Sequence, residues 1–149
     1  MDQAAVDLKR KVKRFNKAIV ALQRAGIAFG PMQLLTAPGR KSGQPRTTPI
    51  AVVPINGQRY IIQAYPQAAW VANARNAQTV TLSRGRRATT VRLVELSVEE
   101  RRPLLREHVA NSSARVAQLF VRSGLAAEAT ADSVAAAADR IAVFRVESA

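Results

Sequence analysis

The chain has 149 residues, enough for one domain with a single hydrophobic core, and nearly half of them are hydrophobic. It contains no cysteine, which excludes disulfide bonds, thiolate metal sites and a cysteine nucleophile, and its single histidine, His108, predicts no metal site. With 23 basic against 10 acidic residues, the net charge of +13 favours an anionic partner: a phosphate-bearing cofactor, a nucleic acid or an anionic lipid.

The distribution of aromatic and apolar residues reduces the number of possible partners. The one tryptophan, two tyrosines and four phenylalanines are not interleaved with the basic clusters, so no nucleic acid is expected, because single strands are bound by aromatic stacking together with charge. No apolar run approaches the roughly 20 residues that a membrane span needs, and no secretory signal is recognisable. We therefore expect a cytoplasmic protein.

The first 30 residues predict a basic amphipathic helical segment. Its apolar residues recur at helical spacing, at Leu8, Val12, Phe15, Ile19 and Leu22, and its lysines and arginines fall away from that stripe. Two interpretations stay open. The helix covers an open end of the core, which we favour, or residues 4–25 make peripheral contact with an anionic membrane.

A strand-rich stretch follows. Short apolar and β-branched runs predict strands over 32–37, 47–55, 58–65, 79–83, 87–96 and 141–146. Asn56 and Gly57, between the second and third runs, give the strongest short-range hairpin signal. Pro49 and Pro54 indicate an edge or a bulge rather than a central strand.

Helices are expected between some of these strands. Residues 67–76 predict a short helix, and Ser97 followed by Glu100 is a capping-box pattern that opens another helix ending near Val109. On that helix His108 is expected to be a solvated surface residue. One or two more helices fall within 113–138. Since no βαβ spacing occurs, we expect a single α+β domain over 1–149, an antiparallel barrel with peripheral helices.

The loop over 36–49 is the most informative segment. It contains glycines and prolines, with the hydroxyls of Ser42, Thr47 and Thr48 and three cations, Arg40, Lys41 and Arg46. Glycines let backbone amides approach phosphate oxygens, and arginine offers a fork for bidentate contact. The spacing of a Walker loop or of a dinucleotide-binding motif is absent. The pattern favours a phosphate-bearing anionic cofactor, and a solvated loop is the alternative.

The stretch GRKSGQPRTTP, at 39–49, resembles the signature of the deazaflavin-dependent nitroreductase and quinone reductase family. Weaker similarities at 69–75 and 143–147 follow in the same order, so the resemblance spans about residues 35–147. Proteins of this family have a split β-barrel and use the reduced deazaflavin coenzyme F-420. The resemblance implies a split barrel of about six strands and an oxidoreductase that transfers a hydride to a small planar acceptor such as a quinone or an enone.

The same resemblance implies the cofactor-binding residues. The coenzyme's phosphate and acidic tail would be held by Arg40, Lys41, Ser42 and Arg46, with Thr47 beside them. The deazaflavin ring would be lined by Thr48, Pro49, Ile50, Gln63, Ala64 and Tyr65, and its wall completed by Trp70 and Asn73. Tyr65 is also the candidate catalytic residue, as a proton donor for which solvent is the alternative. No metal is expected.

The chain departs from the nitroimidazole-activating member of that family, because no tyrosine follows Tyr65. We therefore expect little nitroreductase activity. The inferred walls, Ile50, Ala64, Tyr65 and Trp70, are mostly apolar and favour a neutral acceptor. Two rival functions remain, an oxidoreductase of the same fold that binds flavin mononucleotide (FMN), and a non-enzymatic basic module that binds nucleic acid or anionic membrane. A monomer or a homodimer is expected.

Overall fold

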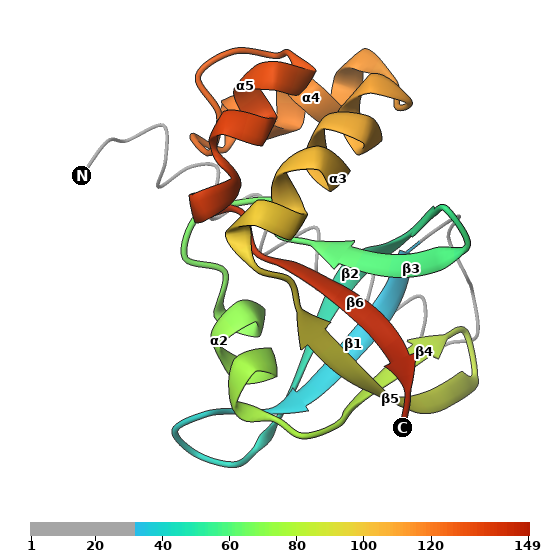
Figure 1. Ribbon diagram of the computed structural model, residues 1–149. Coiled ribbons are helices and arrows are strands. Elements are labelled where there is room, and N and C mark those ends of the chain that lie inside the picture. The colour runs from blue at the N-terminus through green and yellow to red at the C-terminus, as the bar shows by residue number, and fades with distance from the viewer. Residues whose placement is uncertain (1–31) are drawn as a thin grey trace.

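A closed antiparallel barrel of six strands forms the body of the computed structural model, which describes residues 32–149 (Figure 1). Its strands are β1 (Met32–Pro38), β2 (Pro45–Ile55), β3 (Gln58–Ile62), β4 (Val80–Arg84), β5 (Arg87–Glu95) and β6 (Val143–Ser148). Their order around the barrel is β1-β2-β3-β6-β5-β4, and β4 pairs with β1 to close it. The α+β class and the six-stranded antiparallel barrel predicted from the sequence are confirmed. The predicted helix over 1–30 and its membrane contact through 4–25 lie outside the described residues.

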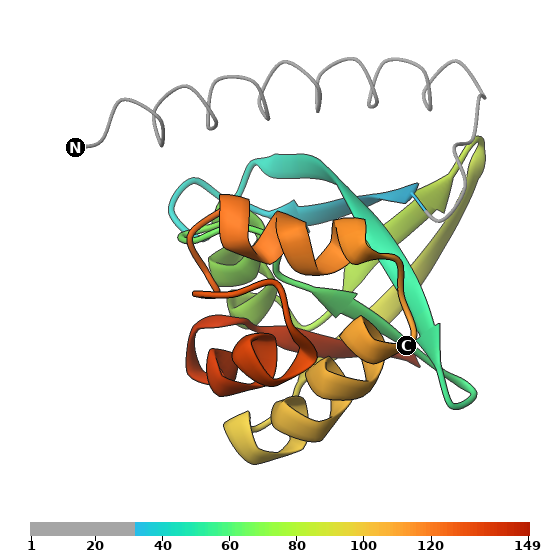
Figure 2. The same ribbon diagram turned by 90° about the horizontal axis from the view of Figure 1, so that it is seen from above.

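Helices cover one end of the barrel and one side. They are α2 (Ala69–Asn76), α3 (Val98–Ala110), α4 (Ala114–Arg122), α5 (Ala131–Ala136) and the short 3-10 helix η1 (Ala138–Arg140). Figures 1 and 2 show α3, α4 and α5 gathered at one end, and Figure 1 shows α2 apart from them beside the loop between β1 and β2. Within residues 32–149 no helix is long and apolar enough to cross a membrane.

Two local signals read from the sequence are confirmed. At the β2–β3 turn, Asn56 and Gly57 have φ of 50° and 79°, the left-handed backbone that a tight hairpin requires. At the start of α3, the Ser97 hydroxyl accepts a hydrogen bond of 3.2 Å from the Glu100 N–H. The Glu100 carboxylate accepts one of 3.2 Å from the Ser97 N–H in return, which completes the capping box.

Strand β2 changes partners along its length. Residues 45–51 pair with β1, and residues 52–55 pair with β3. The strand is therefore part of the barrel wall, where the sequence predicted an edge or a bulge at Pro49 and Pro54. Each half is nevertheless paired on one side only, and this leaves an unpaired side on which a proline loses no ladder hydrogen bond.

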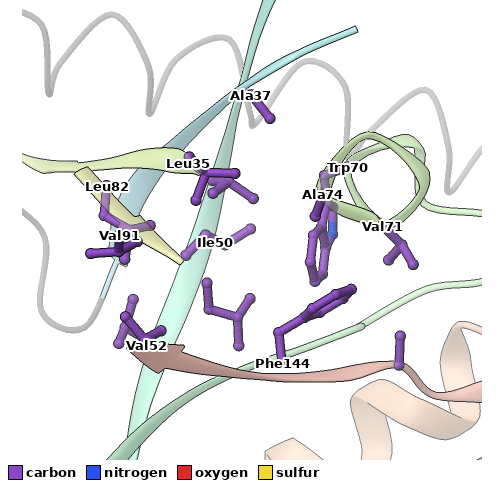
Figure 3. Packing of buried hydrophobic residues seen from close by; sticks show 14 of the residues in the cluster. Leu35, Ala37, Ile50, Val52, Trp70, Val71, Ala74, Leu82, Val91 and Phe144 are labelled. Carbon is purple, nitrogen blue, oxygen red and sulfur yellow. The ribbon is translucent and has the colours of Figure 1, made fainter. Parts of the chain in front are cut away.

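Two apolar clusters fill the structure. The first lies inside the barrel and includes Trp70 of α2, whose ring meets that of Phe144 of β6 at a centroid distance of 5.6 Å and an interplanar angle of 56° (Figure 3). The second lies between the barrel end and helices α3–α5, around Leu105, Val134 and Ile141. Because Trp70 sits in the first cluster, α2 is fixed against the barrel wall.

His108 lies on α3 at the barrel end and is half-buried, not solvated as the sequence suggested. Burial holds the pKa of its imidazole below the usual value of 6.5. The Ser112 hydroxyl lies 3.4 Å from Nδ1 of the ring, one helical turn along. His108, Ser112 and the tip of the β2–β3 hairpin line a cavity of about 250 Å³.

Candidate functional site

The loop between β1 and β2 is a closed turn. The Gly39 N–H donates to the Gln44 carbonyl at 2.8 Å, and the Gly43 N–H donates to the Gly39 carbonyl at 2.9 Å. Gly43 has φ of 71°, a conformation that glycine adopts without strain. At the base of the turn the hydroxyls of Thr36 and Thr47 are 2.9 Å apart. The strands and these hydrogen bonds therefore hold the loop in one shape.

Helix α2 anchors this loop from the side. The Arg40 N–H donates a hydrogen bond of 3.1 Å to Oδ1 of Asn73, a residue only 7 % exposed. The side chain of Asn73 thus satisfies a loop amide that no strand reaches. This connection brings together the loop and the helix that the sequence analysis had placed in one site.

The cations of the loop face solvent. Arg40, Lys41 and Arg46 are exposed, and none of them forms an ion pair with a carboxylate within residues 32–149. The Ser42 hydroxyl accepts from the Gln44 N–H at 3.2 Å and keeps its own proton for a further bond. Uncompensated cations beside a glycine turn fit a phosphate group.

Gly39 allows the loop to close tightly. A Cβ at this position would lie 3.2 Å from the Ser42 hydroxyl oxygen and 3.3 Å from the Gln44 carbonyl oxygen. Those distances are tighter than ordinary van der Waals contact, so a side chain here would require the Ser42 hydroxyl and the Gln44 backbone to shift by a few tenths of an ångström. The sequence therefore needs glycine here for the shape of the loop.

Along β2, the residues that follow the loop become progressively more buried. Thr47 and Thr48 are partly buried, and Pro49 and Ile50 are buried. Ile50 belongs to the barrel cluster, where Figure 3 shows it among the core side chains. Of the four residues, the two threonines thus offer the more accessible surface.

Strand β3 ends at Ile62 and not at residue 65 as predicted, because the side chain of Gln63 replaces the backbone pairing of the strand. The Gln63 N–H donates to the Ala142 carbonyl at 2.9 Å, and Gln63 Oε1 accepts from the Ala142 N–H at 2.9 Å. Gln63 Nε2 donates to the Tyr65 carbonyl at 2.9 Å. These bonds involve both the nitrogen and the oxygen of the Gln63 side-chain amide, so this buried side chain shapes the wall formed by 63–65.

Tyr65 lies at the end of this segment, next to the partly buried Ala64. Its ring is half-buried and packs against the barrel cluster. Burial raises the pKa of its phenol above the usual 10.0, so the hydroxyl remains protonated at neutral pH. Tyr65 can therefore donate a hydrogen bond over the whole physiological range.

Trp70 is a core residue. It is only 5 % exposed, and its ring lies against Phe144 inside the barrel. Trp70 and Ile50 are thus both buried in the barrel cluster.

A cavity of about 400 Å³ opens beside the loop, and it is not apolar. Arg40 and Gln63 are the residues it shares with the site predicted from the sequence. Its other cations, Arg75, Arg101 and Arg140, come from α2, α3 and η1. Its lining therefore differs from the neutral apolar walls expected from the sequence.

One carboxylate joins two of these arginines. Glu95 Oε2 accepts from Arg75 Nη2 at 2.7 Å and from Arg101 Nη2 at 2.9 Å. Arg101 also donates to the backbone carbonyls of Leu96 at 2.8 Å and Ala138 at 3.1 Å. The buried guanidinium of Arg101 is thereby fixed, and it ties the barrel end to α3 and η1.

Sequence reasoning missed these three arginines for a simple reason. Arg75, Arg101 and Arg140 are widely separated in a chain rich in arginine, and no motif connects them. Only the packing of α3 and η1 against the start of β6 brings them together. In residues 32–149 no group of three or more His, Asp and Glu side chains could hold a metal ion.

A family model described as F420H(2)-dependent quinone reductase matches residues 8–126 of the chain. The chain belongs to this family. It is a deazaflavin-dependent oxidoreductase whose coenzyme is F-420 and whose partner is a small-molecule hydride acceptor. Family membership favours the deazaflavin over FMN, and an enzyme over a non-enzymatic basic module.

Solved structures show the same fold at low sequence identity. An F420-H2 dependent reductase, FDR-A, is 24% identical, with 78% of this chain and 94% of that chain covered and a TM-score of 0.53. A protein described as a domain-swapped dimer is 23% identical, with 95% and 98% covered and a TM-score of 0.50. A protein of unknown function from Agrobacterium tumefaciens is 12% identical, with 89% and 54% covered and a TM-score of 0.55. No curated protein matches the chain.

Proposed function

We propose that the β1–β2 loop holds the phosphate of the deazaflavin coenzyme, and that the enzyme transfers a hydride from the reduced coenzyme to a quinone or a cyclic enone. The observation that carries this proposal is the group of uncompensated cations, Arg40, Lys41 and Arg46, on a loop fixed by Asn73. A phosphate contributes charge and several acceptor oxygens, which match arginine forks and loop amides.

The proposed binding residues divide into three groups by their surroundings. Exposed polar groups of the loop, Arg40, Lys41, Ser42, Arg46 and Thr47, bind the phosphate and the acidic tail. Partly buried residues, Thr48, Ala64 and Tyr65, lie beside the ring. Buried residues, Pro49, Ile50, Gln63, Trp70 and Asn73, hold these two groups in place. The family's coenzyme supplies the hydride, and the protein supplies orientation and exclusion of water.

Tyr65 is the proposed proton donor to the acceptor oxygen. Its phenol is protonated at neutral pH because burial raises its pKa. The Tyr65 carbonyl is held by Gln63 Nε2, which fixes the backbone from which the ring projects. A proton donor held in one position can act on the acceptor oxygen in every reaction cycle, whereas a water molecule must first diffuse into the site.

Parallel titrations with the deazaflavin coenzyme and with FMN test the cofactor assignment. We expect the deazaflavin to bind and its reduced form to be oxidised when a naphthoquinone is added, as followed by absorbance. Tighter binding of FMN, with turnover that depends on FMN, would overturn the proposal. Both ligands carry a phosphate group, so a difference in their affinities depends mainly on the ring and the tail.

The assembly state forms part of the proposal. We propose a homodimer in preference to a monomer, supported by the description of one structurally similar protein as a domain-swapped dimer. Light scattering on the eluting protein should give twice the chain mass of 16.1 kDa. A mass equal to one chain across the concentration range would favour the monomer.

A further inference from the structure

The cavity beside the β1–β2 loop carries more positive than negative charge. Arg40, Arg75, Arg101 and Arg140 line it, and among its described lining residues Asp139 is the one carboxylate. Glu95 lies behind the wall and binds two of the arginines. Arg40 is assigned to the coenzyme's phosphate, and the other three guanidinium groups face two carboxylates, which leaves one positive charge uncompensated.

The ion pairs of these arginines are incomplete. Arg75 and Arg101 share the single carboxylate of Glu95. Arg140 lies 3.8 Å from Asp139, too far for a good hydrogen bond, and its other nitrogen donates to the Leu125 carbonyl at 3.2 Å. The guanidiniums of Arg75 and Arg140 thus retain donors for another anion.

Fixed and adjustable cations are combined in this cavity. The Arg101 side chain is 9% exposed and held by backbone carbonyls, whereas those of Arg75 and Arg140 are 51% and 58% exposed and can turn toward a ligand. Ala68 and Ala69 also line the cavity, where α2 begins without a side-chain cap. The positive end of the helix dipole adds to the field there.

We propose that this cavity binds a carboxylate group of the hydride acceptor, so that the preferred acceptor is an anionic quinone or enone. The inference rests on the proposed function. Lys41 and Arg46 do not line the cavity and remain available for the coenzyme's phosphate. Gln63, from the segment proposed to shape the ring site, forms part of the cavity wall. An acceptor stacked at the ring can therefore extend its acid group toward Arg75 and Arg140.

The volume agrees with such an acceptor. A cavity of about 400 Å³ lies in the range of about 300–1,000 Å³ typical of small-molecule sites. A carboxylate there replaces its water shell with guanidinium donors, whereas a neutral group would leave the uncompensated positive charge without a partner. The acid should accordingly bind more tightly than its uncharged ester.

A naphthoquinone carboxylic acid and its methyl ester are matched probes for this site. Equilibrium titration of the protein with the oxidised coenzyme bound measures both dissociation constants without turnover. We expect the acid to bind about tenfold more tightly than the ester. Arg140→Gln should reduce this acid-to-ester preference about fivefold, and Asp139→Asn should increase it because it removes a repelling carboxylate.

The control is Arg115→Gln on α4, which makes the same charge change away from the cavity and should leave the preference unchanged. Thermal unfolding confirms that each variant is folded. An unaltered preference in both Arg140→Gln and Asp139→Asn would overturn the inference, as would wild-type protein that binds acid and ester equally.

Two further results separate the inference from the proposed function. If the acid binds as expected but neither probe oxidises the reduced coenzyme, the anion subsite stands and the proposed acceptor class fails. If Arg140→Gln instead weakens binding of the tailed coenzyme relative to a tail-less deazaflavin, without changing the acid-to-ester preference, the cavity holds the coenzyme tail and the inference is wrong.

Discussion

The backbone N–H of Arg40 donates a hydrogen bond of 3.1 Å to Oδ1 of Asn73, joining the β1–β2 loop to a buried position of α2. The same helix places Trp70 in the barrel core, one turn earlier. Besides its two flanking strands, the loop is thus connected to the core through the side chain of Asn73. The backbone of the loop at Arg40 therefore depends on the position of α2.

The first prediction concerns that side chain. Asn73→Ala removes the acceptor for the Arg40 amide and should weaken coenzyme binding several-fold, because the loop is no longer held in its binding shape. The lost hydrogen bond should cost about 1–2 kcal/mol in the free energy of unfolding. Fluorescence titration and urea denaturation measure the two effects.

A matched control for this change is Asn76→Ala, at the exposed last residue of the same helix. It should leave the coenzyme affinity as it is in the wild type. Equal affinities in Asn73→Ala and wild type would show that the loop does not depend on this hydrogen bond.

The second prediction concerns the phosphate loop. Lys41→Ala combined with Arg46→Ala should weaken coenzyme binding at least about tenfold, because charge-assisted hydrogen bonds to phosphate are individually worth about 1.5–3 kcal/mol. The free energy of unfolding should change by less than about 0.5 kcal/mol, since both side chains are exposed.

The control removes two exposed cations from α4 with Arg115→Ala and Arg122→Ala, which gives the same net charge. If both double variants lose affinity equally, long-range attraction by the net charge explains the effect, and the loop has no specific role. Raising the salt concentration should weaken that non-specific part most.

The strands and turns of the barrel could be predicted because their signals are local. Asn56 and Gly57 specify the β2–β3 turn by their backbone preference, and Ser97 with Glu100 specifies the start of α3 by mutual hydrogen bonds. These signals need no knowledge of the rest of the fold. The loop cations and Asn73 were also placed together, although only the resemblance connected them.

Features that depend on contacts far apart in the chain could not be predicted. The end of β3 is set by Gln63, which pairs with Ala142, 79 residues later. The cavity forms where Arg140 of η1 and Arg75 of α2 line the same space, and no periodicity or motif in the sequence indicates that they lie near each other. The burial of His108 likewise depends on the hairpin that packs beside it.

The third prediction concerns Tyr65 as proton donor. Tyr65→Phe should lower kcat for quinone reduction several-fold with a smaller change in KM, because the phenol acts on the acceptor oxygen during reaction. Since burial raises the phenol pKa above 10.0, the wild-type rate should show no loss from this group between about pH 6 and pH 9. Tyr60→Phe, in the second apolar cluster, is the matched control. An unchanged kcat in Tyr65→Phe would assign the proton to solvent.

The fourth prediction concerns stability and pH. Burial lowers the pKa of His108 below 6.5, so the unfolded chain binds a proton at a higher pH than the native protein does. Stability is therefore complete above about pH 6.5 and decreases as the pH falls from there toward the native pKa. We expect Tm to fall more steeply between about pH 7 and pH 5 in the wild type than in His108→Gln, which does not titrate. Parallel curves of Tm against pH for the wild type and the variant would contradict this prediction.

The last prediction concerns which acceptors are reduced. Both tyrosines of the chain, Tyr60 and Tyr65, precede α2, so no tyrosine of the C-terminal half can close over a bound nitroimidazole. A quinone depends less on enclosure, because it is reduced more readily than a nitroimidazole. We therefore expect quinones to oxidise the reduced coenzyme at least about tenfold faster than nitroimidazoles do, a difference of about 1.4 kcal/mol in barrier. Stopped-flow absorbance of the reduced coenzyme at equal acceptor concentrations measures both rates, with each acceptor and coenzyme mixed without protein as the control. Faster oxidation by nitroimidazoles would show that another group closes the site, and the half-buried ring of Tyr65 would be the first to substitute.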